Sequence, residues 1–203
     1  VLVAVICFYA WFKLIKRGGE GKVYQYLKYF FLLMGASTLL GGFLGHGFNY
    51  ALNIYWKLPY WLVSMFSVAL AERAVIVYSS GLTKPSWAKF FRWMNLIELS
   101  AFIIIAFWTL DFIWVVAHSA YGLLLVVGLF HGYVYLKTKQ KGAKLFLIGV
   151  AVSLLGAVVF LTKFHFSNWF NHLDISHTLM AVSAWFFYKG SMIMVDDPNY
   201  EVR

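Results

Sequence analysis

The chain has 203 residues, of which 62% are hydrophobic and only 12% are charged, with a formal net charge of +9. A soluble domain is about half apolar and about a quarter charged, so this composition excludes a soluble globular enzyme, a disordered chain and a protein that binds nucleic acid from solution. The single cysteine, Cys7, excludes an internal disulfide framework and a cysteine-based zinc cluster. We therefore expect an integral, multi-pass membrane protein of a bacterial inner membrane or an equivalent cell membrane.

Seven apolar segments follow one another along the chain, each near the ~20 residues that a helix needs to cross about 30 Å of hydrocarbon. They predict one all-α domain over residues 1–203, a seven-transmembrane helix bundle with spans at about 1–15, 25–45, 59–80, 93–110, 112–136, 145–163 and 173–194. The first segment is short and already apolar at Val1, which suggests that residues are missing before it. Its Lys13 follows the apolar run, whereas the charges of a signal peptide precede it, so we predict a true span. We expect the aromatic loop 46–58 to lie at the outer interface as a short helix.

Lysine and arginine residues are distributed unevenly between alternate loops. One side collects most of them: Lys13, Lys16, Arg17, Lys22, Lys28, Lys84, Lys89, Arg92, Lys137, Lys139, Lys141, Lys144, Lys189 and Arg203. The other side has Lys57 and Lys163. Cytoplasmic loops are enriched in Lys and Arg, so the pattern predicts an outer N-terminus and a cytoplasmic C-terminus. The same residues favour contact with anionic membrane lipids and give no indication of nucleic-acid binding.

The candidate site residues form one group near the outer ends of the predicted spans. His46 closes the second span, His118 lies about two turns into the fifth, and His172, Asp174 and His177 open the seventh. On a helix, Asp174 and His177 share a face at i, i+3. Histidines, a carboxylate and an open water position are the usual ligands of catalytic Zn²⁺, which acidifies its bound water. We therefore predict metal binding by His46, His172, Asp174 and His177, with His118 as a further ligand or a catalytic proton shuttle.

A second polar group lies deeper, with Glu72 and Arg73 in the third span and Asn95 and Glu98 in the fourth. Ionisable side chains inside a bilayer are expensive and rarely without a role. One arginine between two carboxylates neutralises only one of them, so the other would carry a proton. We interpret this group as a structural charge network. Glu72 becomes a catalytic general base only if the third helix brings it to the outer pocket.

The arrangement resembles the CREST superfamily, which includes alkaline ceramidases and progestin/adiponectin-receptor-like proteins. The resemblance rests on the seven predicted helices, on His46 at the end of the second, and on His172 and His177 at the start of the seventh. The family pattern also has a Ser four residues before the helix-two His, an Asp on helix three, and His-x-x-x-His on helix seven. This chain has Gly42 and Glu72 at the first two positions and one extra residue in the third motif. The resemblance implies a zinc-dependent intramembrane hydrolase that acts on an amide or ester of a lipid substrate.

Other classes of function remain open at this point. A b-type haem protein would use two histidines on facing helices, and His46, His118 and His177 supply such pairs. A non-catalytic accessory or scaffold subunit would use the aromatic surfaces at 87–93, 107–114 and 185–188 for contacts with membrane-protein partners. A proton-coupled carrier would use Glu72, Arg73 and Glu98, but the chain lacks the internal repeat that favours a transporter.

Overall fold

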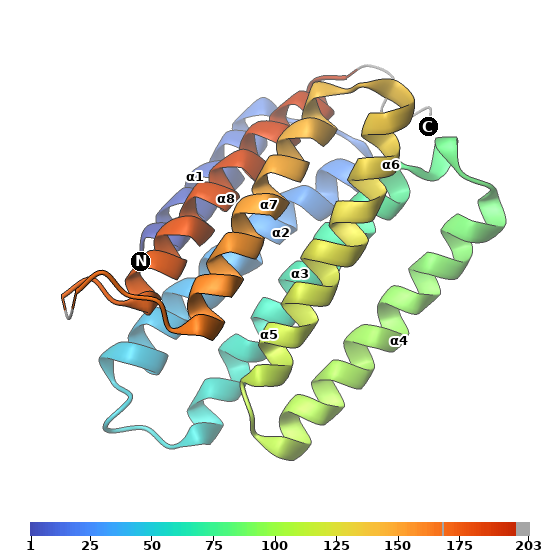
Figure 1. Cartoon of the computed structure of the whole chain (residues 1–203). Coiled ribbons are helices and arrows are strands. Elements are labelled where there is room, and N and C mark those ends of the chain that lie inside the picture. The colour runs from blue at the N-terminus through green and yellow to red at the C-terminus, as the bar shows by residue number, and fades with distance from the viewer. Residues whose placement is uncertain (168, 198–203) are drawn as a thin grey trace.

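The computed structural model describes residues 1–167 and 169–197 as long helices joined by short turns (Figure 1). The α-helices are α1 Leu2–Arg17, α2 Gly21–Leu40, α3 Leu58–Tyr78, α4 Pro85–Thr109, α5 Ile113–Ala120, α6 Gly128–Thr138, α7 Lys141–Thr162 and α8 His172–Asp196. Two π-helices, η1 (Gly41–Gly47) and η4 (Tyr121–Val127), extend α2 and join α5 to α6. The 3₁₀ turns η2 (Ile54–Lys57) and η3 (Ser80–Leu82) flank α3, and η2 provides the short helix predicted in the loop 46–58.

Within the described residues, six helical segments are long and apolar enough to cross a membrane. They are Gly21–Gly47, Ile54–Leu82, Pro85–Thr109, Ile113–Thr138, Lys141–Thr162 and His172–Asp196, and they correspond to the second to seventh predicted spans. The protein is therefore an all-helical, multi-pass membrane protein. The helix over the first predicted span, α1, has 16 residues and is not one of the six. It packs against α2 and α8 and buries Cys7, Ala10 and Leu14 in the core.

The largest difference from the predicted boundaries is at the start of α4. The helix begins at Pro85, whereas the apolar run predicts a span only from residue 93. Proline is well suited to the first turn of a helix, where its missing N–H has no partner to lose. Lys89 and Arg92 lie in the additional turns and are exposed, so the helix extends beyond its apolar part without burying a charge.

Successive long helices run in opposite directions, so alternate turns lie at the same end of the bundle (Figure 1). The turns around 18–20, 79–84 and 139–140 lie at one end, which we call the basic end. The turns around 48–53, 110–112 and 163–171 lie at the other, which we call the opposite end. An ion pair between Arg17 and Asp196 joins the last turns of α1 and α8 at the basic end. Arg203, which we counted with the basic side, lies outside the described residues.

Replacing Arg17 with glutamine should change the stability very little. Both partners of its ion pair are about half exposed, at 53% and 47% of their side-chain surface. Exposed ion pairs contribute about 0–1 kcal/mol, because solvent screens the charges and ordering two long side chains has an entropic cost. Denaturation in mixed micelles should therefore place Arg17→Gln within about 1 kcal/mol of the wild type. A larger loss would mean that the pair fixes α1 to α8.

Glycines allow α7 and α8 to approach closely. A Cβ added at Gly149 would lie 2.6 Å from Cε1 of Phe187, and one added at Gly190 would lie 2.7 Å from Cδ2 of Phe146. The rings of Phe146 and Phe187 fill the space over these glycines and stack on each other with centroids 5.2 Å apart. Small residues at such contacts are how helices associate in a membrane, where water supplies no hydrophobic driving force between them.

Helix α4 is attached to the bundle by a narrow buried stripe. Its buried side chains are Ala88, Asn95, Glu98, Leu99 and Ala106, which recur at the three-, four- and seven-residue spacings of one helix face. The other faces of the helix are exposed and carry large apolar side chains, among them Trp87, Trp93 and Trp108. Two members of the buried stripe are polar, and both belong to the site described next.

Candidate functional site

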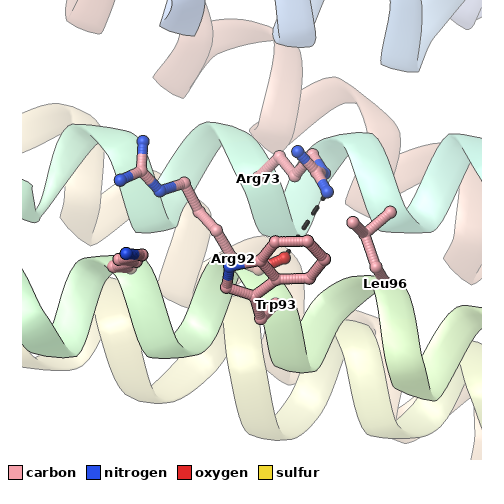
Figure 2. A pocket seen from close by; sticks show the side chains of 5 residues that line it. Arg73, Arg92, Trp93 and Leu96 are labelled. Carbon is pink, nitrogen blue, oxygen red and sulfur yellow. Dashed lines mark hydrogen bonds between the residues drawn. The ribbon is translucent and has the colours of Figure 1, made fainter.

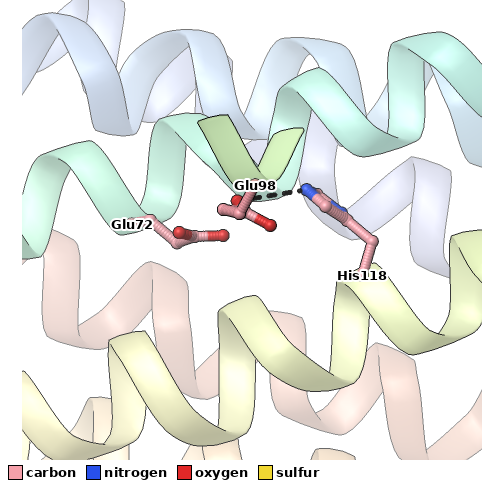
Figure 3. A group of neighbouring side chains, drawn as sticks. All are labelled: Glu72, Glu98 and His118. Atoms are coloured by element: carbon pink, nitrogen blue, oxygen red, sulfur yellow. Dashed lines mark ion pairs between the residues drawn. The ribbon is translucent and has the colours of Figure 1, made fainter. Parts of the chain in front are cut away.

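Three buried side chains from three helices meet inside the bundle. Glu72 of α3, Glu98 of α4 and His118 of α5 each offer one ligand atom, and these atoms lie within 4.8 Å of one another (Figure 3). The exposed fractions of the three residues are only 1%, 8% and 0%. We call these residues the Glu–Glu–His cluster. Among the described residues, this is where three His, Cys, Asp or Glu side chains come this close to one another.

Local structure brings each residue to the cluster. Glu98 follows Asn95 by three positions, so both lie on the buried face of α4. His118 lies in the short helix α5, just before the π-helix η4. Gly122, in the first turn of η4, lies so close to α3 that an added Cβ would clash with Oε1 of Glu72 and Cγ1 of Val68. Short π-helical segments are frequent at functional sites.

Most polar atoms of the cluster lack a hydrogen bond. Oε1 of Glu72, both carboxylate oxygens of Glu98 and both ring nitrogens of His118 are buried without a hydrogen-bond partner. The closest approach between charged partners is 3.5 Å, between Nε2 of His118 and Oε1 of Glu98. Most buried polar atoms in proteins are hydrogen-bonded, and an exception calls for an explanation such as an ion or a water. One ligand atom from each of the three residues lies close to the other two, which is the arrangement expected of a ligand site.

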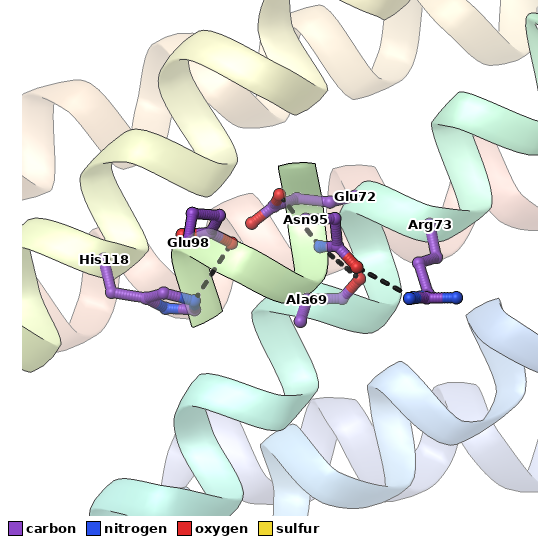
Figure 4. A network of polar contacts seen from close by, with 6 residues as sticks. All are labelled: Ala69, Glu72, Arg73, Asn95, Glu98 and His118. Carbon is purple, nitrogen blue, oxygen red and sulfur yellow. Dashed lines mark hydrogen bonds and ion pairs between the residues drawn. The ribbon is translucent and has the colours of Figure 1, made fainter. Parts of the chain in front are cut away.

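Asn95 connects the cluster to its surroundings (Figure 4). Its Nδ2 donates to Oε2 of Glu72 at 3.1 Å and to the carbonyl oxygen of Ala69 at 3.3 Å. Its Oδ1 accepts a hydrogen bond of 2.8 Å from Nε of Arg73. Asn95 therefore holds one carboxylate of the cluster in place and separates it from the guanidinium group.

Arg73 belongs to the polar network, but it reaches Glu72 through Asn95 and does not pair directly with either carboxylate. Its side chain hydrogen-bonds to Oδ1 of Asn95 and, at 3.5 Å, to the carbonyl oxygen of Arg92. In the part of the chain that the structure describes, no carboxylate oxygen lies within 4.0 Å of its guanidinium. Neighbouring side chains on a helix point about 100° apart, so Glu72 and Arg73 face different directions. The sequence alone does not show which of the two faces Glu98. The two carboxylates thus share a buried site with one imidazole and without Arg73.

This arrangement has the chemistry of a cation site. Two buried carboxylates without a cation are unfavourable, so the cluster must take up protons or a positively charged ion. Two carboxylates and one imidazole are three ligands of the kind that Zn²⁺ and other divalent metals accept, and they leave a coordination position open. His118 and Glu72, which we predicted as catalytic residues of the outer pocket, thus lie together in this deeper cluster with Glu98.

A cavity of 1070 Å³ extends into the bundle from the opposite end. Its wall is largely apolar and includes Phe30, Met34, Trp61, Leu124, Phe160 and Phe187. Polar side chains also line it, including Ser37, Thr38, Lys57, Ser119, Ser153 and Ser183. Val68 and Ser119 form part of its wall, and they come from the same helices as Glu72 and His118. Glu72, Glu98 and His118 do not themselves line the cavity, and Val68 lies one helical turn before Glu72.

The four predicted zinc ligands take different places at the opposite end. His46 and His177 are neighbours, with ring centroids 5.9 Å apart, and both line the cavity. The carboxylate of Asp174 accepts a hydrogen bond from the backbone N–H of Asn171 and completes a capping box at the start of α8. His172 instead lies beside the ring of Phe160, with centroids 6.4 Å apart. The structure brings together the pair His46 and His177 but does not gather all four ligands around one point.

Counting residues from helix ends placed His118 in the wrong group. The count put His118 with the outer histidines and Glu98 in a deeper layer, yet the two side chains are partners. When two helices differ in length and tilt, the same number of residues from the end does not mean the same depth in the membrane. The sequence therefore could not show which residues of α4 lie opposite which residues of α5. The spacing of Asn95 and Glu98 on one helix face was a usable indication that both point into the bundle.

The fold and the site define the class of protein: an α-helical, multi-pass membrane protein with a buried cluster of acidic and histidine side chains. Residues 1–196 match a family of unknown function, DUF6962, and the chain belongs to that family. No curated protein and no solved structure matches the chain.

Proposed function

We propose that this protein is a membrane-embedded, metal-dependent hydrolase whose cation is held by Glu72, Glu98 and His118. The observation that supports this proposal is the convergence of buried ligand atoms without hydrogen-bond partners in the Glu–Glu–His cluster. The proposal moves the metal from the predicted outer set to the deeper cluster. His46 and His177 then belong to the entrance of the cavity.

The three ligands leave room for water on the cation. A divalent metal such as Zn²⁺ would supply acidification of that water and polarisation of a carbonyl group. Asn95 orients Glu72 through its hydrogen bond to Oε2 and leaves Oε1 without a hydrogen-bond partner. A residue that hydrogen-bonds to a metal ligand typically fixes both the orientation and the basicity of that ligand.

The substrate that fits the cavity is an amphiphile with an ester or amide bond. The wall is apolar over most of its surface, and serine, threonine and histidine side chains are distributed along it. Ligand sites typically combine such a wall with a few polar groups that fix the orientation of the ligand. The lipid would lie along the apolar wall with its ester or amide bond directed to the part of the wall formed by Val68 and Ser119, which come from the same helices as Glu72 and His118.

The basic end supports a proposal for the membrane orientation. We place seven helical passes across the membrane, with the N-terminus outside and the C-terminus in the cytoplasm. The support is the concentration of lysine and arginine at the basic end, together with the apolar length of the six long segments. On this orientation, the cavity opens towards the outer leaflet.

The metal content of the detergent-purified protein tests the site. We expect about one divalent cation per chain in the wild type. Glu98→Gln and His118→Ala should lose it, because each removes one of three ligands. His131→Ala is the matched control, because His131 is also fully buried but stacks on Phe146 away from the cluster. Loss in His177→Ala with retention in Glu98→Gln would overturn the site and return the metal to the outer set.

Two further measurements test the hydrolase and its alternative. An absorbance spectrum of the same sample should have no Soret band; a band lost in His177→Ala would instead assign the histidines to haem b. The metal-loaded wild type should release fatty acid from a panel of ester- and amide-linked lipids, and Glu98→Gln should not. Metal binding without release from any member would overturn the hydrolase. A protein with neither metal nor haem would fit the accessory subunit.

A further inference from the structure

A second pocket lies between α3 and α4 towards the basic end (Figure 2). It has a volume of 310 Å³ and is lined by Arg73, Lys89, Arg92, Trp93 and Leu96. The lining therefore contains three cationic side chains and no acidic one. The pocket is separate from the large cavity, with which it shares no lining residue.

Among the described residues, no carboxylate pairs with the cations of this pocket. In residues 1–167 and 169–197, the ion pairs are Arg17 with Asp196 and His118 with Glu98, so none involves Arg73, Lys89 or Arg92. Nε of Arg73 is engaged by Asn95, and its Nη2 reaches the carbonyl oxygen of Arg92 at 3.5 Å. Nε of Arg92 donates to the carbonyl oxygen of Ala88 at 3.3 Å. The other N–H groups of the two arginines have no hydrogen-bond partner among the described residues and are available to an anion.

The depth of the pocket matches the head-group region of a membrane. Arg73 lies five residues before the end of α3, and Arg92 lies seven residues after the start of α4. At a rise of about 1.5 Å per residue, both lie within about 10 Å of the helix ends. Trp93 is 59% exposed beside them, and tryptophan is enriched where the hydrocarbon meets the head groups.

We propose that this pocket binds the phosphate group of an anionic phospholipid from the leaflet at the basic end. Phosphate suits the site because guanidinium groups donate paired hydrogen bonds to its oxygens and Lys89 adds a third positive charge. The acyl chains would lie along the exposed apolar side chains of α4, beginning at Leu96 and Ile97. Basic pockets between membrane helices bind lipid head groups by the same chemistry. The proposal does not depend on the metal or on hydrolysis.

Native mass spectrometry of the purified full chain with dioleoyl phosphatidylglycerol tests the pocket. The variant is the double substitution Lys89→Gln and Arg92→Gln, which leaves the backbone oxygen of Arg92 available to Arg73. The matched control is Lys141→Gln and Lys144→Gln, which removes two exposed lysines near the same end from α7. We expect about 10-fold weaker lipid binding in the pocket variant and less than about 2-fold in the control. Dioleoyl phosphatidylcholine should bind the wild type more weakly than phosphatidylglycerol.

Three results would overturn the proposal. An equal loss in both double variants would mean that the lipid responds only to the overall charge of the basic end. Unchanged binding in the pocket variant would mean that the lipid binds elsewhere. Inorganic phosphate that binds without lipid and displaces phosphatidylglycerol would assign the pocket to free phosphate. The metal content should be the same in the wild type and in both double variants. A change in lipid binding at constant metal content therefore tests the pocket independently of the hydrolase.

Discussion

Replacing Asn95 with leucine is expected to lower the free energy of unfolding by about 2–4 kcal/mol. Leucine has the same branching and the same number of side-chain heavy atoms as asparagine, but it removes the hydrogen bonds to Glu72, to the carbonyl oxygen of Ala69 and to Arg73. Glu72 and Ala69 are buried, so water cannot replace Asn95 at these two partners. Each polar group buried without a partner costs about 1–3 kcal/mol. Reversible denaturation in mixed micelles measures the difference.

Ser100→Leu is the control for this substitution. Ser100 lies on the same helix but is exposed, so the change should fall within about 0.5 kcal/mol of the wild type. If the two substitutions lower the free energy of unfolding equally, the polar contacts of Asn95 contribute no stability beyond the effect of any leucine introduced into α4. The metal content of Asn95→Leu should also fall, because Glu72 loses the partner that orients it.

Replacing Gly122 with alanine should have two effects, on stability and on cation binding. The added methyl group would clash with Oε1 of Glu72 and with Cγ1 of Val68. Val68 is branched at Cβ and cannot turn aside without leaving its preferred rotamer, so the carboxylate of Glu72 must move. Overpacking of this kind costs about 1–3 kcal/mol. Displacing one ligand of a metal site should weaken the affinity for the cation by about 10-fold or more.

Gly42→Ala is the matched control for this glycine. Gly42 also lies in a π-helix, η1, but nothing lies within 4 Å of a Cβ added there. Gly42→Ala should therefore leave both the stability and the affinity for the cation unchanged, as measured by denaturation and by titration with Zn²⁺. If Gly122→Ala lowers the stability but leaves the affinity as it was, Glu72 is not a ligand.

The helices were predictable and the cluster was not, for a physical reason. Long apolar runs are required to cross a bilayer, so hydropathy locates the six long helices directly. The partnership of Glu98 with His118 depends on how α4 lies against α5, which is decided by packing over the whole length of both helices. Asn95 and Glu98 could be placed on one face of a helix, but the face they meet could not be identified from spacing alone.

The two π-helices were also beyond sequence reasoning. Gly41–Gly47 is rich in glycine, which weakens a helix but does not specify a π-turn, and Tyr121–Val127 has the composition of an ordinary apolar helix. A π-turn forms where tertiary contacts favour the insertion of one residue, so its cause lies in the neighbouring helices. Gly122 illustrates this, because its close approach to Val68 and Glu72 is possible only without a side chain.

The narrow buried stripe of α4 links the occupancy of the cluster to the docking of a whole helix. Two of the five buried side chains of α4, Asn95 and Glu98, belong to the cluster or to its immediate support. A cation that binds only while α4 is docked favours the docked state, by about 2.7 kcal/mol when its concentration is a hundred times its dissociation constant. Removing the cation would then weaken the docking of α4 by the same amount.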